Sequence, residues 1–158
     1  MNDASQTMPE RAAAIRRAAA RLCRMMGWAP LHEVRLANGR RADILALRGD
    51  GGFVCIEVKS GIRDFMTDQK WPEYLEFCDA LYFAVDGDFP VGVLPEEAGL
   101  IVAEAAGAEV LREAPEVGMV PARRRALLYR FAVLAANRLA GLEDPAGEAD
   151  LRSALRAE

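Results

Sequence analysis

Residues 53–60 have the sequence FVCIEVKS, an apolar run that closes with an acid and a base. Lys59 in this run is one of two lysines in the chain, against eighteen arginines. Because the sequence otherwise uses arginine for positive charge, a lysine two residues after Glu57 indicates a site that needs a compact, mobile cation rather than a rigid guanidinium. The preceding run, residues 40–47 (RRADILAL), adds Asp43. The motif is therefore an aspartate, thirteen intervening residues, and then Glu-Val-Lys.

Both runs are predicted to be strands of one hairpin, since residues 48–52 (RGDGG) between them are dense in turn residues. Alternation along a strand puts Glu57 and Lys59 on one face, and apolar residues occupy both faces of each strand. A buried charge without a partner costs on the order of several kcal/mol, so these groups must pair with one another or bind something. Two carboxylates and an ammonium are typical of a Mg²⁺ site, where the ion takes one or two carboxylates and substrate phosphate.

These residues resemble the motif of the PD-(D/E)XK nuclease superfamily. More closely, residues 28–85 resemble the MmcB family of bacterial DNA repair proteins, and the resemblance covers roughly residues 8–140. It implies an α/β fold with a restriction-endonuclease-like core, a mixed β-sheet flanked by helices. The proline that often precedes the motif's aspartate is replaced by Ala42. The stretches that carry the resemblance are Arg41-Ala42-Asp43, Glu57-Val58-Lys59-Ser60, Asp64-Phe65 and Asp68-Gln69-Lys70-Trp71.

The resemblance implies a Mg²⁺ or Mn²⁺ site. Asp43 and Glu57 would be carboxylate ligands, and the carbonyl of Val58 could be a third ligand. The alternative is structural: Asp43 would pair with Arg41 or Lys59, and Glu57 with Lys59. A further glutamate, which the superfamily often contributes from an earlier element, is left open between Glu10 and Glu33, and Glu33 is surface charge if it points away from the site.

Lys59 would hold the attacking water or stabilise charge that develops on the phosphate. Electrostatic stabilisation of this kind is often the largest contribution to catalysis. Gln69 and Lys70 follow on the helix that in this superfamily often lends a polar side chain to the site. The competing interpretation of both residues is a solvated helix face.

The net charge of −4 is unevenly distributed. Residues 8–48 carry nine arginines and three acids, residues 49–120 carry four basic and fifteen acidic residues, and residues 121–142 carry five arginines and no acid. A phosphate backbone responds to local potential more than to the total charge, so the two basic blocks favour DNA as a partner. The candidate DNA-binding residues are Arg41, Lys70, Arg123, Arg124 and Arg125, each of which has a solvated surface position as its alternative.

The chain length suits a single domain. We expect its core over roughly residues 8–140, with residues 143–158 as either a mobile tail or a short final helix. The helical connection before residue 80 should make the strand that follows it parallel. The expected elements are a helix from a capping box at residues 7–10 to Gly27, strands at 31–36, 40–47, 53–60 and 80–85, a helical connection at 64–77, a hairpin at 99–102 and 108–112, and a helix at 121–142 with Leu127, Leu128, Phe131, Leu134 and Ala135 inward.

Several classes are disfavoured by the sequence. No signal-like start or membrane-length apolar stretch is found, so we expect a cytoplasmic protein with no membrane partner. The three cysteines lack CxxC spacing and are predicted to be buried thiols rather than zinc ligands. His32 is the only histidine, which disfavours histidine-based triads.

The function expected from the motif and the resemblance is a DNA repair protein that acts as a Mg²⁺- or Mn²⁺-dependent DNA endonuclease. Two alternatives are a non-catalytic DNA-binding repair accessory and a protein-interaction module that retains the nuclease fold. The motif leaves open whether the DNA is duplex, single-stranded, branched or damaged. The same resemblance allows a homodimer and a repair or replication protein as partners, without naming a surface for either.

Overall fold

The computed structural model describes residues 6–156, and the chain divides into two compact units, Met1–Val120 and Pro121–Glu158. Each unit is described by itself. None of the helices within residues 6–156 is long and apolar enough to span a membrane.

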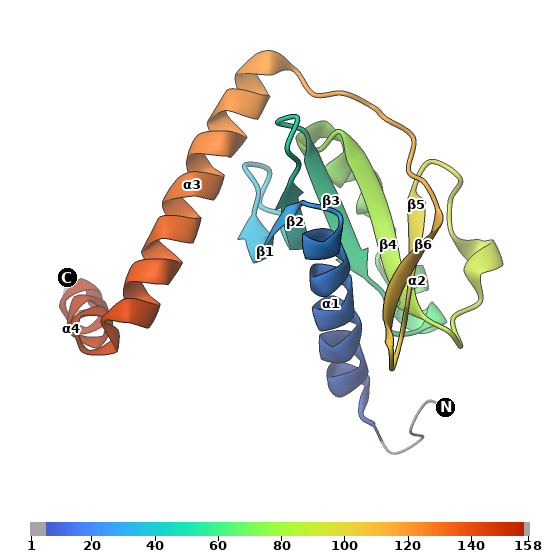
Figure 1. Ribbon diagram of the computed structural model, residues 1–158, viewed down its shortest axis with the longest axis horizontal. Coiled ribbons are helices and arrows are strands. Elements are labelled where there is room, and N and C mark those ends of the chain that lie inside the picture. Colours follow the sequence, from blue (N-terminus) through green and yellow to red (C-terminus); the bar gives the residue numbers. More distant parts are fainter. Residues whose placement is uncertain (1–5, 157–158) are drawn as a thin grey trace. The chain divides into compact units, whose positions relative to one another are not determined.

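The first unit is built on a six-stranded mixed sheet in the order β1-β2-β3-β4-β5-β6 (Figure 1). β3, β4 and β5 run parallel to one another, and the other neighbouring pairs are antiparallel. The predicted mixed sheet, including the parallel strand after the helical connection, is therefore confirmed. The strands are β1 Ala29–Arg35, β2 Arg41–Leu47, β3 Phe53–Val58, β4 Ala80–Asp86, β5 Gly99–Glu104 and β6 Gly107–Arg112.

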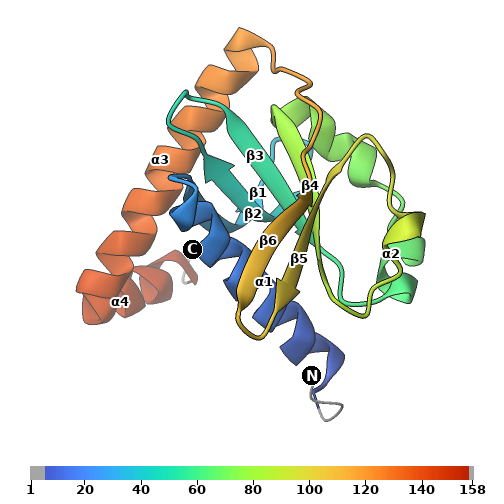
Figure 2. The ribbon, with the colours of Figure 1, turned by 45° about the vertical axis from the view of Figure 1, so that its right-hand side comes forward.

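One face of the sheet is covered by α1, which spans Met8–Met25 (Figures 1 and 2). It begins at the predicted capping box, in which the Thr7 side chain accepts from the N–H of Glu10 and the Glu10 carboxylate accepts from the N–H of Thr7. Its buried residues, among them Ile15 and Cys23, pack against the side chains of β2 to β5 that face it. The capping box and the apolar stripe thus set the start and the orientation of this helix.

The segment between β3 and β4 forms a short helix, α2 (Ile62–Thr67), and a 3₁₀ helix, η1 (Trp71–Phe77). Phe65 from α2 and Trp71 from η1 both pack edge-on against Phe83 of β4, with ring centroids 5.5 Å and 6.1 Å apart. A second 3₁₀ helix, η2 (Val91–Val93), lies between β4 and β5. Every residue of β3 is buried, as the apolar residues on both of its faces predict.

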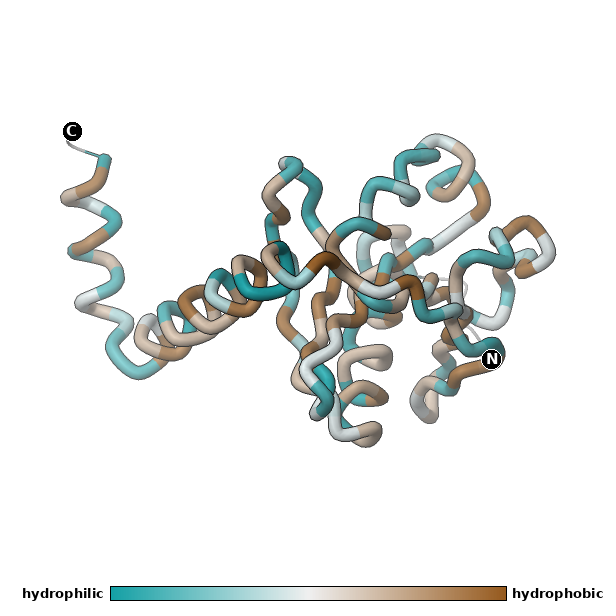
Figure 3. Tube along the Cα trace, turned by 90° about the horizontal axis from the view of Figure 1, so that it is seen from above, coloured by the Kyte–Doolittle hydropathy of each residue, from teal (hydrophilic) through white to brown (hydrophobic). Residues whose placement is uncertain are grey.

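The second unit consists of α3 (Pro121–Glu143) and α4 (Pro145–Arg156), along which apolar and hydrophilic residues alternate (Figure 3). Leu127 and Phe131 are buried as predicted, but the prediction for Leu128 is wrong, since it is 46% exposed. Residues four apart share a helix face, whereas the next residue lies about 100° around the axis. The end of the chain had two predicted alternatives, a mobile tail or a short final helix. The structure has the helix, α4.

Candidate functional site

The candidate site lies where β2 and β3 part. The last paired residues of the two strands are Ile44 and Ile56. Beyond them, the N–H of Asp43 donates to Oε1 of Glu57 at 3.3 Å, and the N–H of Val58 donates to Oδ2 of Asp43 at 2.8 Å. Side-chain carboxylates therefore satisfy backbone groups that the strand ladder leaves open at this point.

The two carboxylates lie in a poorly hydrated environment. Glu57 is only 4% exposed, and burial together with the charge of Asp43 raises its pKa to about 8. Burial also raises the pKa of Asp43, and the charge of Asp64 acts in the same direction. A pair of acids whose ionised forms are both disfavoured should gain from a nearby cation.

Lys59 is the buried cation of this site, with 4% of its surface exposed. Its Nζ lies 3.2 Å from Oδ2 of Asp68, in the loop between α2 and η1. Burial alone would raise the pKa of Asp68, but the Lys59 ammonium and the N–H of Lys70 lower it further than burial raises it. The charge of Lys59 also lowers the pKa values of Asp43 and Glu57, so it partly offsets their mutual repulsion.

These side chains line one cavity of about 470 Å³. One wall is a strip of α1 with small side chains that ends in Arg16. The opposite side carries the acids and the lysine, together with Tyr74, whose hydroxyl donates to the carbonyl of Arg41 at 3.0 Å. The lining residues are Pro9, Ala12, Ala13, Arg16, Glu33, Arg41, Asp43, Glu57, Val58, Lys59, Asp64, Asp68 and Tyr74.

The cavity gathers most of the residues that the sequence predicted for the site. The predicted residues that line it are Asp43, Glu57, Val58, Lys59, Arg41 and Glu33. Glu33 pairs with Arg16 there, at 3.2 Å between Oε1 and Nη1. Glu10, the other candidate for an extra acid, uses its carboxylate in the cap of α1.

Other predicted residues lie elsewhere. Neither Gln69 nor Lys70 lines the cavity: the Gln69 side chain donates to the carbonyl of Phe65 at 2.7 Å, and Lys70 precedes η1. Arg123, Arg124 and Arg125 lie in the first turns of α3, in the second unit. Their role remains a prediction from charge alone.

Sequence reasoning did not assign three charged residues of the cavity. They are Arg16, Asp64 and Asp68. Asp64 and Asp68 lie in stretches that carried the resemblance, outside the motif itself, and Arg16 follows Pro9, Ala12 and Ala13 at helical spacing. That spacing was the available signal that these α1 residues share one face.

The donor set fits a hard divalent cation. Within residues 6–156, no group of three or more His, Cys, Asp and Glu side chains is arranged to hold a metal ion. Mg²⁺ needs fewer, because it keeps several waters and takes one or two carboxylates plus phosphate oxygens. Val58 donates its N–H toward β2, and a strand residue directs its N–H and C=O to the same side, so its carbonyl faces the gap as well. Asp43, Glu57 and this carbonyl are the groups that could hold Mg²⁺ or Mn²⁺.

Comparison with known proteins places the chain in a family. The family model described as DNA repair protein MmcB-like matches residues 1–146. The chain belongs to the MmcB-like family. This confirms the MmcB resemblance, while membership of the PD-(D/E)XK superfamily stays a prediction.

A solved structure shares the fold of this MmcB-like protein. It is the SPO1766 protein of unknown function from Silicibacter pomeroyi, with 43% sequence identity and a TM-score of 0.83. The alignment covers 87% of this chain and 94% of that chain. A search of curated proteins finds no match.

Proposed function

We propose that this MmcB-like protein is a DNA repair endonuclease that uses Mg²⁺ or Mn²⁺ to hydrolyse phosphodiester bonds. The observation that carries the proposal is the meeting of Asp43, Glu57 and the buried Lys59 in one cavity at the place where β2 and β3 part. Membership of a family of DNA repair proteins supports DNA as the substrate.

The reaction would be the attack of water on a backbone phosphate, in line with the departing sugar oxygen. One P–O bond forms as another breaks, and the leaving oxygen takes up a proton, so that a phosphate monoester and a hydroxyl end result. When bound, the divalent cation would supply positive charge to the phosphate and lower the pKa of water. Asp43 and Glu57 would hold that cation, and the Val58 carbonyl would complete the protein's share of the ligands.

Lys59 would contribute charge that is already in position before the reaction begins. Its ammonium is buried and held by Asp68, so little reorganisation is needed as negative charge builds on the phosphate oxygens. Lys59 would therefore act on turnover more than on DNA affinity. Asp68 would be a positioning residue, since it acts on the phosphate through Lys59.

Basic residues outside the acid pair would supply DNA affinity. Arg41 is exposed on β2 and lines the cavity, and Lys70 is exposed in the loop before η1. Arg123, Arg124 and Arg125 belong to the basic block at the start of α3, where a helix N-terminus adds partial positive charge. Each of these groups would contact phosphates of the DNA backbone, which carry no sequence information.

The proposal is tested by incubating the purified protein with single-stranded, duplex, flap and four-way-junction DNA in Mn²⁺, Mg²⁺ or EDTA. Closed circular DNA is included because only an endonuclease can cut it. Metal-dependent cutting that is lost in Lys59→Met, but not in a folded variant far from the cavity such as Glu109→Gln, is the expected result. Binding without cutting on every substrate would overturn the nuclease and favour the repair accessory instead.

A further inference from the structure

Arg16 is a cation of the cavity to which neither the motif nor the resemblance assigns a role. It lies on α1, where the cavity wall is otherwise formed by Pro9, Ala12 and Ala13. Because these side chains are small and uncharged, Arg16 is the one charged group that α1 presents among the lining residues. Its charge is near enough to the acid pair to lower the pKa of Asp43.

The guanidinium of Arg16 has a hydrogen-bond donor that no acceptor satisfies in the described part of the chain. Its Nη1 meets the Glu33 carboxylate at 3.2 Å, but its Nε is buried and has no hydrogen-bond partner in the described part of the chain. A guanidinium presents its N–H groups as a planar fork that matches two oxygens of one phosphate. An anion that enters the cavity could take the place of the Glu33 carboxylate at Nη1, and it would reach the buried Nε only after the arginine side chain turns.

The acid that faces Arg16 is held by an unfavourable backbone. Glu33 has φ of +49°, and it is the only non-glycine residue with positive φ in the described part of the chain. It stands between the paired positions His32–Ile44 and Val34–Ala42, and thus opposite Asp43 in the β1–β2 register. Such strained residues cluster at ligand sites, which makes the placement of this acid a candidate for function.

The Arg16–Glu33 pair repeats the arrangement of the Lys59–Asp68 pair. In each, the acid side chain is more exposed than the base: 49% against 33% in the first pair, and 38% against 5% in the second. In both pairs the acid is therefore the more hydrated partner, and all four residues line the cavity. Glu33 is the more exposed of the two acids and can be rehydrated at little cost, so an incoming anion could displace it from Arg16, whereas Asp68 stays on the buried Lys59.

We infer that Arg16 binds a phosphate group of the DNA strand in this cavity, and that Glu33 holds the guanidinium until the phosphate displaces it. The inference rests on the proposed function for its ligand class, because it takes nucleic acid as the molecule that enters. It goes further in naming an anchoring residue and an internal competitor. The contact is to phosphate, so it is independent of base sequence.

The test measures DNA binding in EDTA, where no cutting occurs, by fluorescence anisotropy of a short labelled oligonucleotide. Arg16→Gln should weaken binding by about tenfold or more and lower the salt slope by about one. Glu33→Gln should tighten binding by about two- to fivefold, because the competing acid is gone. The expected result is that the two variants change DNA affinity in opposite directions.

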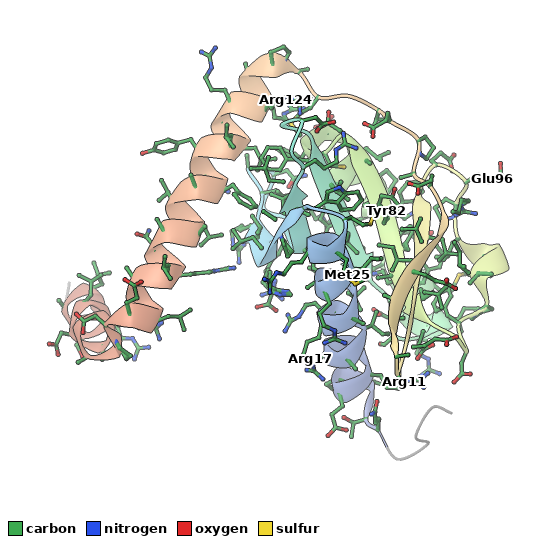
Figure 4. All side chains as sticks on the ribbon, in the orientation of Figure 1. Arg11, Arg17, Met25, Tyr82, Glu96 and Arg124 are labelled. Atoms are coloured by element: carbon green, nitrogen blue, oxygen red, sulfur yellow. The ribbon has the colours of Figure 1, made fainter. Side chains whose placement is uncertain are left out.

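The matched control is Arg17→Gln, which removes the same charge from the next residue of α1. Arg17 is exposed and does not line the cavity, and it leaves the helix on a different side from Arg11 (Figure 4). It should bind DNA nearly as the wild type does. If Arg16→Gln does not fold, Arg16→Lys keeps the charge but loses the fork, and it should show a smaller loss in the same direction.

The inference is overturned if Arg16→Gln binds as Arg17→Gln does, if the Arg16 and Glu33 variants shift affinity in the same direction, or if the wild type does not bind. Oligonucleotides with and without a 5′-phosphate separate the two sources of the ligand. Binding that needs the 5′-phosphate supports a strand end, and equal binding supports a backbone phosphate. A wild type that binds in this way but never cuts in Mn²⁺ overturns the nuclease proposal alone.

Discussion

The Glu57 carboxylate accepts a hydrogen bond from the N–H of Asp43 at 3.3 Å, at the point where β2 and β3 stop pairing. The same two residues carry the acids whose pKa values burial raises. Backbone geometry thus holds two carboxylates together in an environment that disfavours the charge of both. This relationship leads to predictions about metal, pH and turnover.

Metal binding should stabilise the protein. Mn²⁺ is expected to raise the melting temperature of the wild type, because a ligand that binds only the folded state adds to its stability. Asp43→Asn should abolish the rise, since it removes one of the two charged ligands while keeping an oxygen for the N–H of Val58. Thermal unfolding across a Mn²⁺ titration measures both. An equal rise in the two proteins would contradict the metal site, and Glu109→Gln, at an exposed position of β6, serves as the charge-matched control.

Without metal, stability should fall as pH rises. The pKa of Glu57 is about 8 in the folded protein and 4.5 ordinarily, so between these values the folded state holds a proton that the unfolded chain has released. The contribution of protonated Glu57 to the free energy of unfolding is complete below pH 4.5 and is lost as pH rises through 8. Glu57→Gln should flatten this decline. Urea unfolding in EDTA at several pH values measures it, and parallel curves for the two proteins would rule the prediction out.

Loss of Lys59 should reduce turnover more than stability. Lys59→Met is expected to lower kcat by about a hundredfold or more, as does removal of other preorganised groups at developing charge. Stability should change little, because the released Asp68 is 38% exposed and can be hydrated. Lys59→Arg should not restore kcat, since a guanidinium differs from an ammonium in size and geometry. Full activity in Lys59→Met would remove this residue from the mechanism.

Filling the cavity should block the substrate without unfolding the protein. Ala13 is half-buried on α1 and lines the cavity, and leucine is almost as good a helix former as alanine. Ala13→Leu should therefore abolish DNA cutting and leave the melting temperature close to that of the wild type. Arg17→Leu places the same side chain at an exposed position of the same helix and should keep its activity. Equal activity in the two variants would show that the substrate does not enter this cavity.

The local elements of the first unit could be predicted from the order of residues alone. The capping box at Thr7 and Glu10 predicted where α1 begins. Asn38-Gly39, between β1 and β2, is a dipeptide typical of hairpin turns, and its glycine has φ of +84°. The apolar residues on both faces of residues 53–60 predicted the doubly buried β3. Each of these features depends on neighbours within a few residues, so periodicity and turn chemistry were sufficient to predict it.

Which side chains meet across long stretches of sequence depends on how the chain folds and packs. Arg16 reaches Glu33, and Lys59 reaches Asp68 rather than one of the motif's acids. The exposure of Leu128 also could not be predicted from helical spacing, which placed its side chain inward. A sequence pattern fixes the period of a helix or strand, but the rotation of a helix about its axis and the path of a loop are set by packing against the rest of the chain. For this reason the motif predicted the acid pair and its lysine, while the cavity that surrounds them required the fold.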